Sequence, residues 1–248
     1  MCILVFDWQP GTQQPLLLLA NRDEFHQRPT AALAQWPDQP RIHAGRDLQA
    51  GGSWLGIAPG RRFAALTNIR EPEAPQPLSR GELVSDYLAG RQSPAAYIQQ
   101  LVDKAGQYSG FNLLTGDANE LWFLHSRTPV PRLLAPGIYA LCNASLDTPW
   151  PKLVRLRSAF SQLPRDDDAA LFSLMQDTWR PADAMLPDTG MSLTIERTLS
   201  SIFIRGDEYG TRATSLLRMD TGGITLTERS FAPGGLPAGD CSLVVASI

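Results

Sequence analysis

Short apolar runs separated by turns dominate the hydrophobic pattern of this chain, and segments with helical periodicity interrupt them at two places. Runs that are rich in β-branched and aromatic residues and bounded by Gly, Pro, Asn or Asp are typical of β-strands. On this pattern, strands are predicted over residues 3–6, 16–20, 62–67, 111–115, 121–125, 137–141, 201–205, 211–219, 224–231 and 242–245.

Apolar side chains spaced three and four residues apart predict two pairs of helices between these strands. In the first pair, one helix begins at a capping box formed by Ser79 and Glu82, and the other begins at Ser93 with a proline directly after it. The second pair is predicted over residues 152–162 and after the aspartates at 166–168. Strands and helix pairs that alternate in this order favour an α+β fold over a doubly wound sheet.

Other stretches are predicted to be irregular. Residues 28–49 are rich in Pro, Gln and Ala with weak periodicity, residues 71–77 are rich in Pro, and residues 180–191 are predicted to form a loop. Residues 220–223 have the composition of a hairpin turn. Neither an internal repeat nor a linker interrupts the pattern, so we expect one domain over residues 1–248.

The composition excludes several classes of protein. The chain has 248 residues, of which 43% are hydrophobic, and this supplies a sizeable core. A net charge of −3 and scattered arginines argue against a surface that follows nucleic-acid phosphates. No apolar run reaches the about 20 residues that cross a bilayer, and the first residues lack the pattern of a secretory signal. We therefore expect no nucleic-acid partner and no integral membrane segment.

The cysteines and histidines do not form a metal-binding pattern. Cys2, Cys142 and Cys241 are an odd number without metal-ligand spacing, and the three histidines show none either. A glycine-rich phosphate-binding loop with its lysine is also missing from the sequence. We expect no metal and no cofactor, and a reducing compartment, hence the cytoplasm, is the simplest interpretation of the cysteines.

The first 28 residues contain the strongest candidate for chemistry. Cys2 stands directly behind the initiator Met1, and the second predicted strand ends in the polar cluster Asn21-Arg22-Asp23-Glu24. If the first two strands pair antiparallel, this cluster lies at the same end of the sheet as Cys2. A thiol would then face one arginine and two carboxylates.

Removal of Met1, which a small second residue usually permits, would make Cys2 the first residue of the mature chain. Its α-amino group would titrate at about 7.7–8.0 and could accept the proton of a thiol that titrates at about 8.5. Arg22 would favour the thiolate. Asn68 and Asn143, each at the end of a predicted strand, offer NH₂ donors for an oxyanion.

Each of these features also has a plain structural interpretation. Cys2 can be a small apolar residue of an edge strand, and the polar cluster can be a solvated turn. Single asparagines at strand ends are commonly turn residues. The combination of the cluster and the asparagines with a cysteine near the start favours a site over these alternatives.

Ordered motifs along the whole chain resemble the NRDE family, also called the transport and Golgi organisation family. Cys142 stands where a serine is expected before the asparagine, and this departure affects no predicted catalytic residue. The matching motifs are Met1-Cys2 with its apolar strand, Leu19-Ala20-Asn21-Arg22-Asp23-Glu24, Gly51-Gly52-Ser53-Trp54-Leu55-Gly56, Leu66-Thr67-Asn68-Ile69-Arg70, Ser79-Arg80-Gly81, Asn143-Ala144-Ser145-Leu146-Asp147-Thr148-Pro149-Trp150-Pro151-Lys152, Ser200-Ser201-Ile202-Phe203-Ile204 and Tyr209-Gly210-Thr211-Arg212.

The resemblance implies the four-layer αββα fold of N-terminal-nucleophile hydrolases, in particular of the choloylglycine hydrolase and acylase branch. In that branch, a cysteine exposed by Met removal is supported by an arginine and an aspartate at the end of the second strand, by two asparagines and by a later arginine. Glu24 has no clear counterpart there. By position and neighbours, the corresponding residues of this chain are Cys2, Arg22, Asp23, Asn68, Asn143 and Arg212.

Two functions are compatible with this resemblance. The first is hydrolysis of an amide or thioester bond of a small-molecule substrate by Cys2. The alternative is a non-catalytic carrier on the same fold, for haem or an acyl lipid, with Arg22 or Arg212 pairing the carboxylates. Members of the family have been connected to secretory-pathway organisation, to lipid or acyl-CoA metabolism and to intracellular haem handling. The hypothesis that the ligand is haem depends on this association alone. The sequence does not indicate an oligomeric state.

Overall fold

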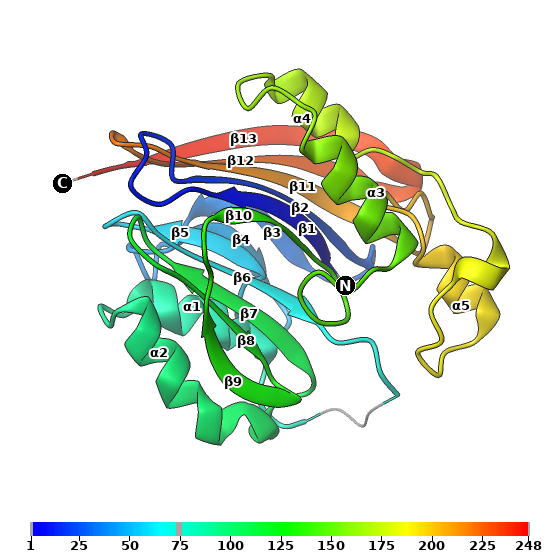
Figure 1. Ribbon diagram of the computed structural model, residues 1–248, viewed down its shortest axis with the longest axis horizontal. Helices are drawn as coiled ribbons and strands as arrows, with labels where there is room; N and C mark the ends of the chain where they lie inside the picture. Colours follow the sequence, from blue (N-terminus) through cyan, green and yellow to red (C-terminus); the bar gives the residue numbers. More distant parts are fainter. Residues whose placement is uncertain (1, 73–75, 248) are drawn as a thin grey trace.

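Two antiparallel sheets packed face to face form the centre of the protein, in a computed structural model that describes residues 2–72 and 76–247 (Figure 1). Met1 and part of the loop predicted at residues 71–77 lie outside the described residues. Sheet A has the spatial order β10 (Gly137–Leu141), β1 (Cys2–Trp8), β2 (Leu16–Phe25), β11 (Tyr209–Met219), β12 (Gly223–Ala232) and β13 (Leu236–Ala246). Sheet B has the order β3 (Thr30–Gln35), β4 (His43–Asp47), β5 (Leu55–Ala58), β6 (Arg62–Asn68), β7 (Phe111–Gly116), β8 (Leu121–His125) and β9 (Thr128–Leu133).

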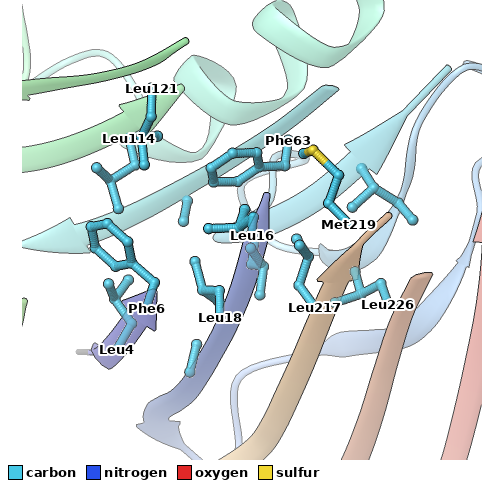
Figure 2. Close-up of a cluster of buried hydrophobic side chains, with 14 of the residues drawn as sticks. Leu4, Phe6, Leu16, Leu18, Phe63, Leu114, Leu121, Leu217, Met219 and Leu226 are labelled. Carbon is cyan, nitrogen blue, oxygen red and sulfur yellow. The ribbon is translucent and has the colours of Figure 1, made fainter. Parts of the chain in front are cut away.

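The main hydrophobic core lies between the two sheets. Figure 2 shows Phe6 and Leu18 of sheet A and Phe63 of sheet B within one buried cluster. Successive side chains of a strand point to opposite faces, so Ile3 and Val5 belong to a second cluster on the outer side of sheet A. Because both faces of β1 are covered, its sequence is apolar without a break from Cys2 to Phe6 and does not alternate.

Helices cover the outer faces of both sheets (Figure 1). On sheet B, α1 (Arg80–Ala89) and α2 (Pro94–Leu101) bury Leu83, Tyr87 and Ile98 in a third cluster. On sheet A, α3 (Pro151–Phe160) and α4 (Asp168–Leu174) bury Leu156 and Phe172. The layers therefore follow the order αββα, and the predicted fold class is confirmed. The remaining helical segments are α5 (Leu193–Thr198) and the 3₁₀ turns Val102–Gln107, Asp183–Met185 and Pro233–Gly235.

Several local predictions are confirmed by hydrogen bonds. Ser93 Oγ accepts from the backbone N–H three residues later at 3.2 Å, and Asp167 Oδ1 does the same at the start of α4 at 2.9 Å. At the hairpin turn, Asp220 Oδ1 accepts from the N–H of Gly222 at 2.7 Å. Each of these side chains satisfies a backbone donor that a helix end or a tight turn leaves without a partner.

The capping box predicted at Ser79 is wrong in its side-chain contacts. Ser79 is the N-cap residue of α1, but its side chain makes no capping hydrogen bond. The carboxylate of Glu82 accepts from the Tyr108 hydroxyl at 2.7 Å. A tertiary partner has thus replaced the local one.

The irregular excursion predicted over residues 28–49 is also wrong, since this stretch contains β3 and β4. β3 is the edge strand of sheet B and is largely exposed, so its sequence lacks an apolar face. The opposite edge strand, β9, contains Pro129 and Pro131 and was not expected as a strand for the same reason.

The strand predicted at residues 201–205 is absent, although most of that segment is buried. Its backbone pairs with loops and side chains, because Phe203 N donates to the Asp177 carbonyl and the Ile202 carbonyl accepts from Asn21. The loop predicted over residues 180–191 contains the 3₁₀ turn Asp183–Met185, and the short helix α5 that follows was not expected. Within residues 2–72 and 76–247, no helix is both long and apolar enough to cross a membrane.

Candidate active site

Cys2 and Arg22 lie directly opposite each other on the antiparallel strands β1 and β2. The prediction that the polar cluster Asn21-Arg22-Asp23-Glu24 shares an end of the sheet with Cys2 is therefore confirmed. Because side chains alternate between the two faces of a strand, neighbouring residues of this cluster have different surroundings.

Asn21 is fully buried and has a structural role. Its Nδ2 donates to the carbonyls of Met175 at 2.8 Å and Ile202 at 2.9 Å, and its Oδ1 accepts from Thr214 at 2.6 Å. These bonds attach β2 to β11 and to the segments that follow α4 and α5. The side chain therefore positions the strand that carries Arg22 and does not belong to the site itself.

Arg22 is 5% exposed, yet few of its donors are used. Its guanidinium carbon lies 4.3 Å from the centre of the Trp54 ring, a cation–π arrangement. Its Nη1 donates to Thr30 Oγ1 at 3.3 Å, and its Nη2 lies 4.0 Å from a carboxylate oxygen of Glu24. A guanidinium offers five N–H donors, so most of its capacity remains for a ligand.

Asp23 is 1% exposed and accepts a hydrogen bond from Thr211 Oγ1 at 2.7 Å. The Thr211 hydroxyl itself accepts from the Ile204 N–H at 2.9 Å, which fixes its direction toward the carboxylate. Burial raises the pKa of Asp23, while the positive charges of Lys152 and Arg70 act in the opposite direction. A buried carboxylate is thus held next to the start of β1.

Glu24 lies at the rim of the site. It accepts from the Phe25 N–H at 2.9 Å and lies 3.9 Å from Arg28, which in turn pairs with Asp47 at 2.7 Å. This chain of charges links the end of β2 to the end of β4.

Cys2 lines a cavity of about 490 Å³, within the usual size of a small-molecule site. Trp54, Leu66 and Asn68 also line this Cys2 cavity. The charged residues that line it include equal numbers of each sign. The positive ones are Arg22, Arg28 and Arg80, and the negative ones are Asp23, Glu24 and Asp47.

The two predicted asparagines, Asn68 and Asn143, are in contact in the fold. Of the two, only Asn68 lines the Cys2 cavity. Asn143 is 1% exposed, and its Nδ2 donates to the Asn68 carbonyl at 2.8 Å. The Asn143 carbonyl accepts from the Arg70 N–H at 2.8 Å. Asn143 therefore holds the end of β6, on which Asn68 stands.

Arg212 lies away from the Cys2 cavity. The pairing of β2 with β11 matches Asp23 with Thr211 and Arg22 with Ala213, so Arg212 is the extra residue of a β-bulge. A bulge re-aims the side chain at that position. Arg212 Nη1 donates to the carbonyls of Phe25 at 3.1 Å and Arg28 at 2.7 Å, and the residue lines a second cavity.

The Cys2 thiol is buried, and this burial raises its pKa. The negative charges of Asp23 and Glu24 raise it further, and Arg22 lowers it. At neutral pH the thiol is therefore protonated, and a base has to remove its proton before it can act as a nucleophile.

Three residues around this site were not singled out from the sequence. Trp54 stacks on Arg22, Thr211 binds Asp23, and Lys152 is buried with its Nζ donating to the Leu199 carbonyl at 2.7 Å. All three fall inside the motifs that carry the family resemblance, and this position was the one sequence feature that could have identified them. Burial lowers the pKa of Lys152.

The described residues contain no group of three or more His, Cys, Asp or Glu side chains that could hold a metal ion.

Comparison with known proteins places the chain in a family. The family model described as Transport and Golgi organisation 2 matches residues 1–233. The Transport and Golgi organization 2 homolog of Mus musculus is 32% identical, with 93% of each chain covered. The Homo sapiens homolog is also 32% identical over 93% of each chain, and the Drosophila melanogaster protein is 27% identical, covering 89% of this chain and 88% of its own.

Among solved structures, the Caenorhabditis elegans ortholog of N-acylethanolamine-hydrolyzing acid amidase has a similar fold. The TM-score is 0.53 with 10% sequence identity, and 87% of this chain and 92% of the other are covered. At this identity the likeness concerns the fold alone, which is that of an N-terminal-nucleophile hydrolase. On the family model and the curated relatives, this chain belongs to the Transport and Golgi organisation 2 family.

Proposed function

We propose that the protein is an N-terminal cysteine hydrolase that cleaves an amide or thioester bond of a small acyl substrate. The observation that carries this proposal is the position of Cys2, which lines the Cys2 cavity together with Arg22, Asp23 and Asn68. The fold similarity to an amidase supports the same class of reaction. The family membership supports it only through the motifs that form this cavity.

In the proposed reaction, removal of Met1 frees the α-amino group of Cys2. This amine accepts the thiol proton as the sulfur attacks the acyl carbon, and the carbonyl oxygen becomes an oxyanion. The Asn68 amide donates to that oxyanion, and Asn143 holds Asn68 in place. The charges of Arg22 and Asp23 provide the electrostatic field around the ammonium group and the oxyanion that form in this step.

Collapse of the tetrahedral intermediate breaks the bond to the leaving group, which takes the proton from the α-ammonium group. An acyl thioester on Cys2 remains. Water, deprotonated by the same amine, attacks this thioester and releases the carboxylic acid and the free thiol. The steps need neither a metal nor a cofactor, and a free thiol suits a reducing compartment such as the cytoplasm.

Intact-mass spectrometry tests the proposal. The purified protein is exposed to panels of N-acyl amides and acyl-CoA thioesters, and the mass of the mature chain is read in the same spectra. We expect a chain that begins at Cys2 and gains one acyl group per molecule with a reactive donor. The Cys2→Ala variant should gain none, whereas Cys142→Ser, which changes a thiol outside the Cys2 cavity, should behave as the unchanged protein.

A chain that keeps Met1 in the cell would contradict the proposal, and so would an adduct that persists in Cys2→Ala. The alternative of a carrier, including one for haem, would be favoured by saturable one-to-one binding of an acyl compound or haem with no adduct and no turnover. Changes in the Soret band report haem binding in the same samples.

A further inference from the structure

A second cavity of about 420 Å³ lies next to the Cys2 cavity. It is formed where β3 of sheet B packs against β12 and β13 of sheet A. Arg22 and Trp54 line both cavities, whereas Cys2 lines only the first. The stacked pair Arg22–Trp54 is therefore the wall between the two spaces.

Apolar residues make up part of the lining of the second cavity, beside the polar residues His26, Thr30, Glu228 and Ser230. Five alanines line it, together with Phe231 and Pro233. Small side chains on several strands leave room that larger ones would fill, and a slot of this kind suits an apolar chain. The alanines are Ala31, Ala32, Ala213, Ala232 and Ala238.

Two arginines, Arg22 and Arg212, line this cavity together with the carboxylate of Glu228. Arg22 is nine-tenths buried and forms a single hydrogen bond, to Thr30. Arg212 donates only through Nη1 and forms no ion pair with any residue in the part of the chain that the structure describes. Both guanidinium groups line one cavity, so two like charges share it. Burial lowers the pKa of Arg212, the positive charge of Arg22 lowers it further, and the negative charge of Glu24 raises it.

The acidic residues near these arginines already have partners. Glu228 is 4% exposed and accepts from the Leu33 N–H at 2.9 Å, and burial raises its pKa. Glu24 accepts from the Phe25 N–H and lies 3.9 Å from Arg28 and 4.0 Å from Nη2 of Arg22. A small anion in the cavity would relieve the repulsion between the two guanidinium groups and use their spare donors.

We propose that the second cavity binds a small monocarboxylic acid, with its carboxylate between Arg22 and Arg212 and its apolar tail among the alanines. The binding needs no chemistry at Cys2, so it holds whether or not the proposed hydrolysis does.

Isothermal titration calorimetry with octanoate tests this proposal, and Cys2→Ala serves as the reference protein so that hydrolysis cannot contribute. We expect saturable binding of one octanoate per chain, and binding of the uncharged 1-octanol at least about tenfold weaker, because a charge-assisted pair is lost. Arg212→Gln should weaken octanoate about tenfold or more for the same reason. Arg132→Gln, at an exposed arginine of β9, should leave octanoate binding unchanged.

Filling variants locate the ligand. Ala31→Phe should abolish octanoate binding by occupying the second cavity, while Ala34→Phe, at an exposed position of the same strand outside that cavity, should not. Ala50→Phe, at an exposed position that lines the Cys2 cavity, should also leave it unchanged. Circular dichroism confirms that each variant is folded.

Three results would overturn the proposal: no saturable octanoate binding, equal binding of octanoate and 1-octanol, or binding that survives Ala31→Phe and is lost in Ala50→Phe. The last result would place the acid in the Cys2 cavity. Failure of Cys2 to form an acyl adduct would overturn the hydrolase alone, because every titration here is made without the thiol.

Discussion

Cys2 and Cys142 are two buried cysteines at the same end of sheet A, and their surroundings differ. β1 and β10 are paired, with Leu4 opposite Leu141, and Cys142 directly follows the end of β10. Cys2 belongs to the cluster between the sheets and Cys142 to the cluster under α3 and α4. Burial raises the pKa of both thiols.

Only Cys2 lines a cavity among those described here, and Cys142 is 0% exposed. The comparison teaches that neither burial nor a shifted pKa identifies the nucleophile, because both residues have both properties. Access to a cavity separates them. The charges that act on the two thiols also differ, since buried Lys152 and Arg70 lower the pKa of Cys142 and Arg22 lowers that of Cys2.

The largest expected effect concerns the buried ion pair between Arg70 and Glu196. Arg70 Nη1 and Glu196 Oε2 are 2.5 Å apart, and their side chains are 2% and 4% exposed. Arg70→Met leaves a buried carboxylate without its cation, so we expect a loss of about 3–5 kcal/mol in the free energy of unfolding, measured by urea denaturation. The double variant Arg70→Met/Glu196→Leu should be more stable than Arg70→Met. If the single variant loses less than the double, the pair does not stabilise this side of the sheet.

The second expected effect is on access to the two thiols. In the folded protein, iodoacetamide should modify Cys2 at least about 100-fold faster than Cys142, because Cys142 is reached only after a local opening that costs about 3 kcal/mol. Mass spectrometry of the digested protein gives both rates in one sample. In denaturant the two rates should become similar, which serves as the control. Equal rates in the folded protein would remove the distinction between the two cysteines.

The parts of this comparison that the sequence predicted are local. A buried strand, a turn and a second buried strand predict a hairpin, and its antiparallel register brings Arg22 opposite Cys2. Both strands are covered on two faces, so their apolar runs are unbroken. β3 was missed because an exposed edge strand has no apolar run to detect.

The parts that could not be predicted from local pattern depend on distant segments. Thr211 contacts Asp23 only because β11 pairs with β2, and Lys152 is buried by the packing of α3. Arg212 matches the later arginine of the family resemblance, yet a bulge between Thr211 and Ala213 directs it to the second cavity. A bulge adds one residue and leaves no trace in the apolar pattern.

A smaller effect is expected at the wall beside Cys2. Trp54 and Arg22 should show a coupling energy of about 0.5–2 kcal/mol in a double-mutant cycle of Trp54→Phe and Arg22→Met, because the indole is the better cation–π partner. Urea denaturation of the four proteins gives this energy. The pair Trp36 and Arg46, with its guanidinium carbon 4.1 Å from the ring centre, is a matched stack away from both cavities. Coupling at Trp36 but none at Trp54 would show that the wall is not held by this contact.

The smallest effect is a change in the pH dependence of Cys2 alkylation. The thiolate reacts and the thiol does not, so the rate rises as pH passes through the pKa of the thiol. Burial is the main cause that raises this pKa, and the negative charge of Asp23 adds to it. Asp23→Asn removes the charge and keeps an oxygen that accepts from Thr211, so the profile should move to lower pH while the fold is retained.

Glu24→Gln should move the alkylation profile in the same direction by less, because Glu24 is the weaker of the two negative influences on Cys2. Asp47→Asn changes a charge that lines the same cavity but is not among those acting on the thiol, and it should leave the profile in place. A shift to higher pH in Asp23→Asn would mean that Asp23 promotes the thiolate, for example by holding a cation against it. An equal shift in Asp47→Asn would mean that the net charge of the cavity, and not the position of Asp23, controls the thiol.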